Sequence, residues 1–132
     1  MVLVEYMGRL RCVQEISAVT AACMMVKTSV FKAVGGFDEE LKVAFNDIDL
    51  CMKVRKYGVK IVFTPYAELY HYESKSRGME DTPEKQLRFS REVNCFRRKW
   101  ERELLKGDPY YNPNLTLNNT DCSLRKQEKN GD

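Results

Sequence analysis

The chain has 132 residues, of which 43% are hydrophobic and 31% are charged, a composition that fits one folded domain and excludes wholesale disorder. The 22 basic and 19 acidic residues give a net charge of +3, which is too balanced to indicate nucleic-acid binding by itself. The longest mainly apolar run, residues 18–26, is about half as long as a membrane-spanning helix needs to be.

The five cysteines are odd in number and contain no Cys-x-x-Cys pair. This pattern argues against a disulfide framework or a structural zinc site and favours reduced thiols. Glu5 interrupts the short apolar run that opens the chain, so no secretory signal segment is indicated. The sequence therefore predicts a cytoplasmic location.

The first predicted elements lie within residues 14–36, after an irregular entry. Residues 14–26 carry a strand signal that is strongest at 19–26, where apolar residues on both faces are typical of a buried strand. Thr28 is a suitable N-cap for a short helix at 29–34. Gly35-Gly36 is expected to end that helix, because glycine adopts the left-handed conformation readily.

The remaining predicted elements alternate between helix, strand and loop. A long amphipathic helix at about 83–105 is indicated by Thr82-Pro83 at its start and by apolar residues at three- and four-residue steps. Residues 107–132 are expected to be an extended tail. Between residues 37 and 81 the pattern predicts a loop at 37–45, a helix at 46–57, strands at 59–63 and 67–72, and a polar loop at 73–81.

This order of elements indicates an α/β fold, yet no glycine-rich phosphate loop follows any predicted strand. The most informative stretch is the helix start Asn46-Asp47-Ile48-Asp49. At about 100° per residue, Asp47 falls on the apolar stripe of this helix and Asp49 falls on the opposite side. Asp49 is therefore expected at the surface, paired with Lys53 four residues later, whereas Asp47 is expected to point into the interior or a cleft.

Two interpretations of Asp47 stay open at this point. An inward carboxylate can act as a general base that takes a proton from a hydroxyl nucleophile. It can equally be a helix cap that accepts hydrogen bonds from backbone N–H groups. Asp-x-Asp pairs are common metal motifs, but these two acids lie on opposite helix faces.

His71 is the single histidine and stands near the end of a predicted strand. It could bind a divalent metal or a phosphate, or be a structural hydrogen-bonding residue. The neighbouring loop carries Lys75 and Arg77 between small residues. Such a loop could close on a diphosphate or be a solvated surface loop.

Five segments in register carry a family resemblance: residues 20–26 (TAACMMV), 30–38 (VFKAVGGFD), 46–51 (NDIDLC), 57–62 (YGVKIV), and 70–71 with 74–78 (YH and SKSRG). Together they resemble the inverting family 2 glycosyltransferases of the GT-A fold, over about residues 17–78. The resemblance implies transfer of a sugar from a nucleotide-diphosphate sugar to an acceptor hydroxyl, in cell-surface polysaccharide assembly.

The resemblance also implies roles for individual residues. Asp47 takes the place of the catalytic base, and Asn46 stands where the family usually has glutamate, so it can hydrogen-bond an acceptor sugar but carries no charge. Asp49 is assigned to acceptor binding as well. His71 corresponds to a histidine near the metal and diphosphate, with Lys75 and Arg77 as diphosphate-binding residues. A divalent metal, Mn or Mg, is expected in the full-length enzyme.

Family members begin with a nucleotide-binding region and an Asp-x-Asp metal motif, which this chain does not show before residue 47. The sequence therefore predicts a partial GT-A fold, with mixed-sheet strands flanked by helices. Residues 1–106 would form the acceptor-side half of the transferase domain, and this chain would be inactive alone. Self-association or pairing with the missing half is expected, because a half domain exposes apolar surface.

Two other functional classes remain open. A non-catalytic glycan- or protein-binding module would retain part of the fold without the chemistry, and Asn46 favours it. The basic face of the 83–105 helix could instead contact an acidic membrane surface, which would place the protein at the inner membrane periphery. Interspersed acids on that helix argue against nucleic acid.

Overall fold

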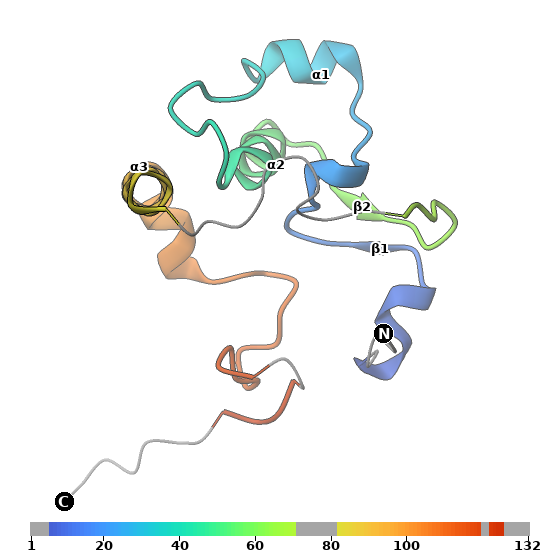
Figure 1. The fold of residues 1–132 in the computed structure, drawn as a ribbon. Helices are drawn as coiled ribbons and strands as arrows, with labels where there is room; N and C mark the ends of the chain where they lie inside the picture. Colours follow the sequence, from blue (N-terminus) through green and yellow to red (C-terminus); the bar gives the residue numbers. More distant parts are fainter. Residues whose placement is uncertain (1–5, 71–81, 120–121, 126–132) are drawn as a thin grey trace, which may run out of the picture.

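In the computed structural model, residues 6–70, 82–119 and 122–125 are described. Helix α2 lies at the centre of the molecule, with α1 above it and α3 beside it (Figure 1). The elements in chain order are the 3-10 turn Tyr6–Arg11, β1 (Gln14–Glu15), the 3-10 turn Ala21–Cys23, α1 (Thr28–Ala33), α2 (Asn46–Lys56), β2 (Val62–Phe63) and α3 (Pro83–Lys106).

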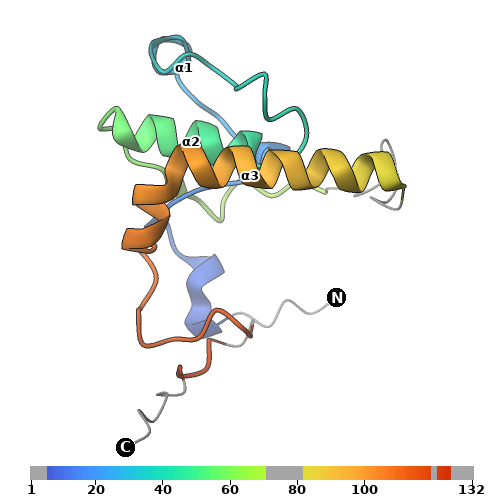
Figure 2. The ribbon, with the colours of Figure 1, turned by 90° about the vertical axis from the view of Figure 1, so that its left-hand side faces the viewer.

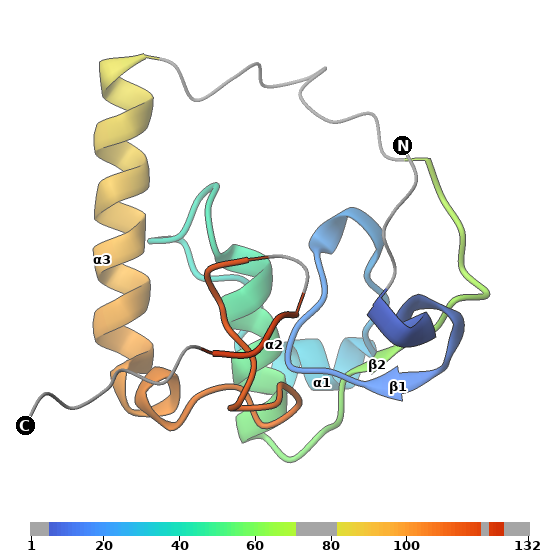
Figure 3. The same cartoon turned by 90° about the horizontal axis from the view of Figure 1, so that it is seen from below.

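Helices α2 and α3 lie side by side and run in the same direction (Figures 2 and 3). Helix α2 contributes to two separate hydrophobic clusters, one on each side of it. The first cluster is Leu50, Cys51, Val54 and Ile61, covered by residues of the 16–34 region. The second is Leu41, Phe96 and Trp100, packed against Ile48 and Met52 of α2. A helix covered on two faces has fewer exposed positions than a surface helix.

The predicted helix boundaries are largely confirmed. Helix α2 ends before Gly58, which has a φ of +92°. Thr82 caps α3 by accepting a hydrogen bond from the backbone N–H of Lys85, and Gly107 at a φ of +76° ends it. Helix α1 starts one residue earlier than expected, so that Lys27 rather than Thr28 is its N-cap.

The strand predicted at 14–26 forms only at its first two residues, as β1, and the strand predicted at 59–63 forms only at its last two, as β2. The segment 19–26 is not a strand. Its middle forms the 3-10 turn Ala21–Cys23, capped by the Thr20 hydroxyl, although Thr20 and Met24 on either side keep extended backbone angles. A buried strand needs hydrogen-bonded neighbours on its edges. In the described ranges the sheet consists of β1 and β2 alone, an antiparallel pair with Gln14 opposite Phe63. The expected mixed sheet is therefore absent from this part of the chain.

The strand predicted at 67–72 is not formed at residues 67–70, and its last two residues lie outside the described ranges. Tyr66, Leu69 and Tyr70 are each more than 70% exposed. Among the described residues no strand lies beside this segment to pair its backbone or to cover these side chains. The predicted loop at 73–81 lies outside the described residues.

The described part of the tail is not simply extended, as the sequence predicts, but consists of turns. Side-chain acceptors at Asp108 and Asn112 bond backbone N–H groups two residues later, a pattern that favours turns. A single β-bridge joins Leu115 to Leu124. The tail returns to β1, where the Tyr110 hydroxyl donates to Glu15. No helix within the described ranges is long and apolar enough to cross a bilayer, and all five cysteines are free.

Candidate active site

Asp47 lies in the first turn of α2 and is partly buried. Its Oδ2 accepts a hydrogen bond from the Ala21 backbone N–H at 3.1 Å, and its Oδ1 accepts from the Ile48 N–H at 2.8 Å. The N-cap position itself belongs to Phe45, so the capping interpretation of Asp47 is correct in its backbone hydrogen bonds but not in its position. No lysine or arginine within the described ranges forms an ion pair with this carboxylate.

Asp49 is not a surface residue, so that prediction is wrong. Its side chain is completely buried, because α3 packs on the face of α2 that the sequence pattern leaves to solvent. Its Oδ1 accepts hydrogen bonds from Trp100 Nε1 and from Lys99 Nζ, both at 2.8 Å. The expected pair with Lys53 is confirmed at 3.0 Å from Oδ2. The acceptor-binding role expected for Asp49 loses its support, since no oxygen of this carboxylate reaches the surface.

The two lysines that neutralise Asp49 also bind the loop that follows α1. Lys53 Nζ donates to the Gly36 carbonyl at 3.0 Å, and Lys99 bridges Asp49 and Asp38. The hydrogen bond from Lys99 holds the pKa of Asp38 below its ordinary value. Burial opposes the charged form of Lys99, but the hydrogen bonds to Asp38 and Asp49 outweigh burial and raise the pKa of Lys99. Charge neutralisation of this kind is what a buried carboxylate requires.

Sequence reasoning missed a second buried acid, Glu92, which is 3% exposed. Its Oε2 accepts a hydrogen bond from the Ala44 backbone N–H at 2.6 Å. A signal was present, because Glu92 stands three residues after Phe89 and four before Phe96, within the apolar stripe of α3. An acid in such a stripe indicates a buried partner.

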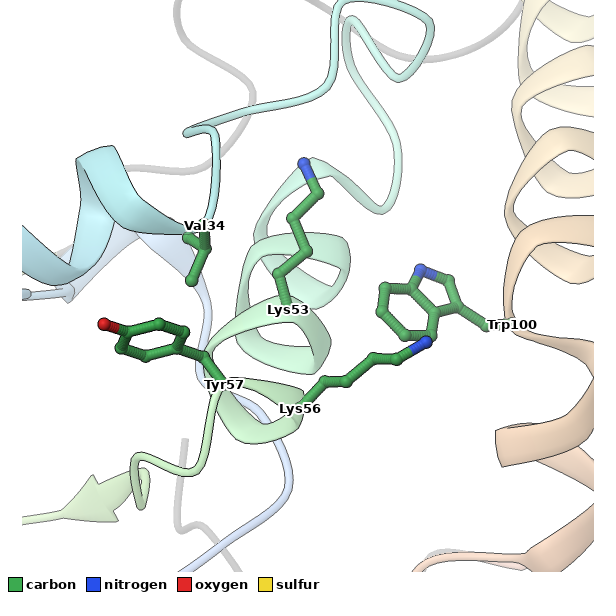
Figure 4. Close-up of a pocket in the computed structure, with 5 residues that line it drawn as sticks. All are labelled: Val34, Lys53, Lys56, Tyr57 and Trp100. Carbon is green, nitrogen blue, oxygen red and sulfur yellow. The ribbon is translucent and has the colours of Figure 1, made fainter.

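A shallow pocket of about 290 Å³ lies between the end of α1, the last turns of α2 and α3 (Figure 4). Val34, Lys53, Lys56, Tyr57 and Trp100 line it. The Lys56 ammonium lies 5.7 Å from the Trp100 ring centroid, a cation–π distance. The pocket is separate from Asp47, which is at the opposite end of α2.

Of the remaining predicted site residues, the structure describes Asn46 alone. Asn46 begins α2 beside Asp47 and is partly buried. His71, Lys75 and Arg77 lie outside the described residues. Within the described ranges no group of three or more histidine, cysteine or acidic side chains is arranged to hold a metal ion. The metal implied by the resemblance therefore finds no ligand set in this part of the chain.

Comparison with known proteins identifies the family. The family model described as glycosyltransferase like family 2 matches residues 5–93, which is more than half of the chain. The chain belongs to glycosyltransferase family 2. The matched region contains the turn that precedes α2, the whole of α2 and the first part of α3. It thus includes both Asp47 and the two buried acids that tie α2 and its preceding loop to α3.

Several curated relatives of this glycosyltransferase chain are much longer than it is. It is 57% identical over 120 residues to the uncharacterized protein y4gI of Sinorhizobium fredii and 39% identical over 115 residues to the O-antigen biosynthesis protein RfbC of Myxococcus xanthus. These alignments cover 90% and 87% of the chain but only 13% and 9% of the two relatives.

A third match is shorter. The N-acetylglucosaminyl-diphospho-decaprenol L-rhamnosyltransferase of Mycobacterium tuberculosis is 36% identical over 61 residues, which are 46% of this chain and 20% of the relative. No solved structure gives a significant match. The aligned residues thus cover about a tenth to a fifth of the length of each of these relatives.

Proposed function

We propose that this chain supplies the acceptor side of an inverting glycosyltransferase, with Asp47 as the catalytic base. One observation carries the proposal, namely the different environments of two acids in one helical turn. Asp49 is fully buried and bound by Trp100, Lys99 and Lys53. Asp47 is partly exposed and is held only by backbone N–H groups among its described contacts. Of these two acids, Asp47 alone is available to a substrate.

The proposed reaction is a single displacement at the anomeric carbon of a nucleotide-diphosphate sugar. The acceptor hydroxyl oxygen forms the new bond as the bond to the diphosphate oxygen breaks, and Asp47 takes the hydroxyl proton. The N–H groups of Ala21 and Ile48 fix the carboxylate in place, and such fixation favours a productive geometry. Asn46, next to Asp47, would hydrogen-bond the acceptor sugar.

The donor side of the reaction is proposed to lie outside the described residues. A divalent metal would stabilise the departing diphosphate when bound, with His71 near it and Lys75 and Arg77 on the diphosphate. We further propose that this chain is part of a longer protein that supplies a nucleotide-binding half, and that the chain alone is inactive.

The proposed biological role is assembly of a cell-surface polysaccharide. It is supported by the names of two relatives, an O-antigen biosynthesis protein and a rhamnosyltransferase that acts on a decaprenol-linked acceptor. We propose an acceptor of this general kind, a glycan or a lipid-linked sugar, and a cytoplasmic location at the membrane periphery. Apolar side chains at Met25, Leu69 and Tyr70, all more than 70% exposed, support pairing with further protein surface.

The test is Asp47→Asn in the full-length transferase that contains this chain. Loss of a general base is expected to lower kcat by about 100-fold or more. Glu101→Gln, the same acid-to-amide change at an exposed position of α3, serves as the matched control and should leave kcat unchanged. Sugar transfer that survives Asp47→Asn within a few-fold would refute the assignment and leave Asp47 as a structural residue.

A non-catalytic glycan-binding module is the second candidate, and Asn46 in place of a second acid favours it. The two candidates differ in their need for a donor. A binding module would retain acceptor oligosaccharides in calorimetric titrations without any nucleotide sugar. Sugar transfer by the full-length protein that depends on Asp47 would exclude a purely binding role.

A further inference from the structure

The segment that leads to Asp47 lies along α3 for most of its length. Figure 3 shows this segment beside α3 and α2. Its contacts run toward the start of α3 as far as Ala44 and then return along α3 with α2. Toward the N-terminal end of α3, Asp38 binds Lys99, the Cys95 thiol donates to Glu40, and Glu92 accepts a hydrogen bond from the Ala44 N–H. On the return, Phe45 stacks on Phe96 and Asp49 accepts from Trp100.

Three residues or pairs of residues anchor this segment to α3, and the first anchor is Glu92. Burying a carboxylate is costly unless it finds a donor, and the described hydrogen-bond donor to Glu92 is the backbone N–H of Ala44. This N–H belongs to the turn three residues before Asp47. The other oxygen, Oε1, lies 3.9 Å from Arg88 Nε within α3 itself. The contact of Glu92 with the preceding segment is thus made to backbone, which limits how far the turn can move.

The second anchor is Phe45, whose backbone has a φ of +63°. A left-handed conformation at a residue other than glycine is maintained only when its surroundings impose it. Here the Phe45 ring stacks on Phe96 with centroids 5.1 Å apart and planes 21° apart, and it also contacts Phe89 at 5.9 Å. The Phe45 carbonyl accepts the first hydrogen bond of α2, from the Asp49 N–H at 2.8 Å. The stacking thus sets where α2 begins.

The third anchor lies on the other side of Asp47. Trp100 and Lys99 both donate to Asp49 Oδ1, which fixes the rotation of α2 about its own axis. Asp47 stands between the anchored Phe45 and the anchored Asp49. Its direction is therefore set by α3, although none of its described hydrogen bonds involves α3.

From these contacts we infer that Glu92, Phe96 and Trp100 of α3 are positioning residues for Asp47. The expected effect on catalysis rests on the proposed function of Asp47. The claim that these residues fix the position of Asp47 does not depend on that function. Displacement of a reacting group by about 1 Å can cost about 100-fold in rate. Loosening α3 should therefore slow the chemical step without weakening binding of the donor.

The kinetic test compares Glu92→Met, which removes the acceptor of the Ala44 N–H at similar size, and Trp100→Phe in the full-length transferase that contains this chain, alone and combined with Asp47→Asn. Each single variant is expected to lower kcat about tenfold, with the KM for the donor within about twofold of wild type. In the Asp47→Asn background the same changes should have no further effect, because residues that act through one group are not additive. Equal losses in both backgrounds would overturn the inference.

A second measurement does not depend on activity. The amide of Ala21 donates to Asp47 Oδ2, so its NMR chemical shift reports where the carboxylate lies. In Glu92→Met, Phe96→Leu and Trp100→Phe, this amide should move toward its shift in Asp47→Ala, and the Ala44 amide should exchange with solvent about tenfold faster. The control Arg97→Gln, at an exposed position of α3, should change neither.

The outcomes separate the inference from the proposed function. Sugar transfer that survives Asp47→Asn refutes the catalytic role, while the Ala21 shift still tests whether α3 positions the side chain. Loss of transfer in Asp47→Asn with unchanged kcat in every α3 variant refutes the positioning role alone. The positioning role would also be refuted if the α3 variants fold and keep the wild-type chemical shift of the Ala21 amide and the wild-type exchange rate of the Ala44 amide.

Discussion

Trp100 Nε1 donates a hydrogen bond to Asp49 Oδ1 across 2.8 Å, and both side chains are buried. This contact joins α3 to α2 over a sequence separation of 51 residues. It places a charged acceptor at the centre of the helix–helix interface, where a hydrogen bond to a charged group contributes more than one between neutral groups. The mutual position of the two helices therefore depends on it.

Replacement of Trp100 by phenylalanine tests that dependence. Trp100→Phe keeps an aromatic ring but removes the N–H donor, so the free energy of unfolding should fall by about 2–3 kcal/mol. Urea unfolding of the chain measures this. Tyr66→Phe, at a side chain that is 86% exposed, is the control and should change stability by less than about 0.5 kcal/mol. A Trp100→Phe variant as stable as the control would contradict the prediction.

The two acids of α2 should differ sharply when each is changed to asparagine. Asp49→Asn leaves Lys53 and Lys99 without their shared buried counter-charge, and breaking a buried pair costs about 3–5 kcal/mol. Asp47→Asn keeps an acceptor oxygen and should cost about 1 kcal/mol or less. Thermal unfolding of both variants provides the comparison. Equal losses would mean that the burial of Asp49 has no energetic consequence.

Stability should depend on pH through Asp38. Its pKa is lowered in the folded chain by the hydrogen bond from Lys99, then by the Glu40 N–H. The folded state therefore binds this proton less readily than the unfolded chain does. The stabilisation is present above the ordinary pKa of 3.8 and is lost as pH falls through the lower folded value. Unfolding measured from about pH 5 to pH 2 should show a smaller loss for Asp38→Asn than for wild type.

Gly36 should tolerate alanine less well than Gly35. Both have positive φ, at +64° and +79°, so either substitution is strained. A Cβ on Gly36 would also lie 3.1 Å from two ring carbons of Phe31, whereas none lies within 4 Å at Gly35. We expect a loss of about 1 kcal/mol for Gly35→Ala and a larger one for Gly36→Ala. A larger loss at Gly35 in denaturant titrations would contradict this packing argument.

The cysteines should differ in reactivity. Cys51 is 3% exposed in the first hydrophobic cluster, and burial raises the pKa of its thiol. Cys23 is exposed. Because the thiolate is the reactive species, a thiol reagent at pH 8 should modify Cys23 readily and Cys51 only slowly. Mass spectrometry after timed labelling identifies each site, and the denatured chain should lose the difference. Rapid labelling of Cys51 in the folded chain would be inconsistent with its burial.

The helices of this chain could be predicted from local sequence signals. Thr82-Pro83, Gly58 and Gly107 mark helix ends because capping hydroxyls and left-handed glycines act within a few residues of the backbone. The same local reasoning placed Asn46 and Asp47 at the start of α2. The family could also be inferred from segments between residues 17 and 78, and the family match over residues 5–93 confirms it.

The strands could be predicted only in part, since strand formation depends on partners distant in the sequence: β1 and β2 lie within the segments predicted at 14–26 and 59–63 but are much shorter. Residues 19–26 have strand composition and extended flanks, but without a neighbouring ladder their middle folds as a 3-10 turn. Among the residues that the structure describes, a ladder forms only where Gln14 and Glu15 meet Phe63 and Val62. Composition alone does not specify whether such a partner is present.

Local sequence determined where α2 begins and that it carries two acids, but the tertiary structure decided what each acid does. Helical periodicity assigns one buried face to α2, because a single helix contains no information about a second neighbour. Packing of α3 on the opposite face buried Asp49 against Trp100 and left Asp47 partly exposed. Burial is a property of the assembled chain, since it depends on contacts between residues some fifty positions apart.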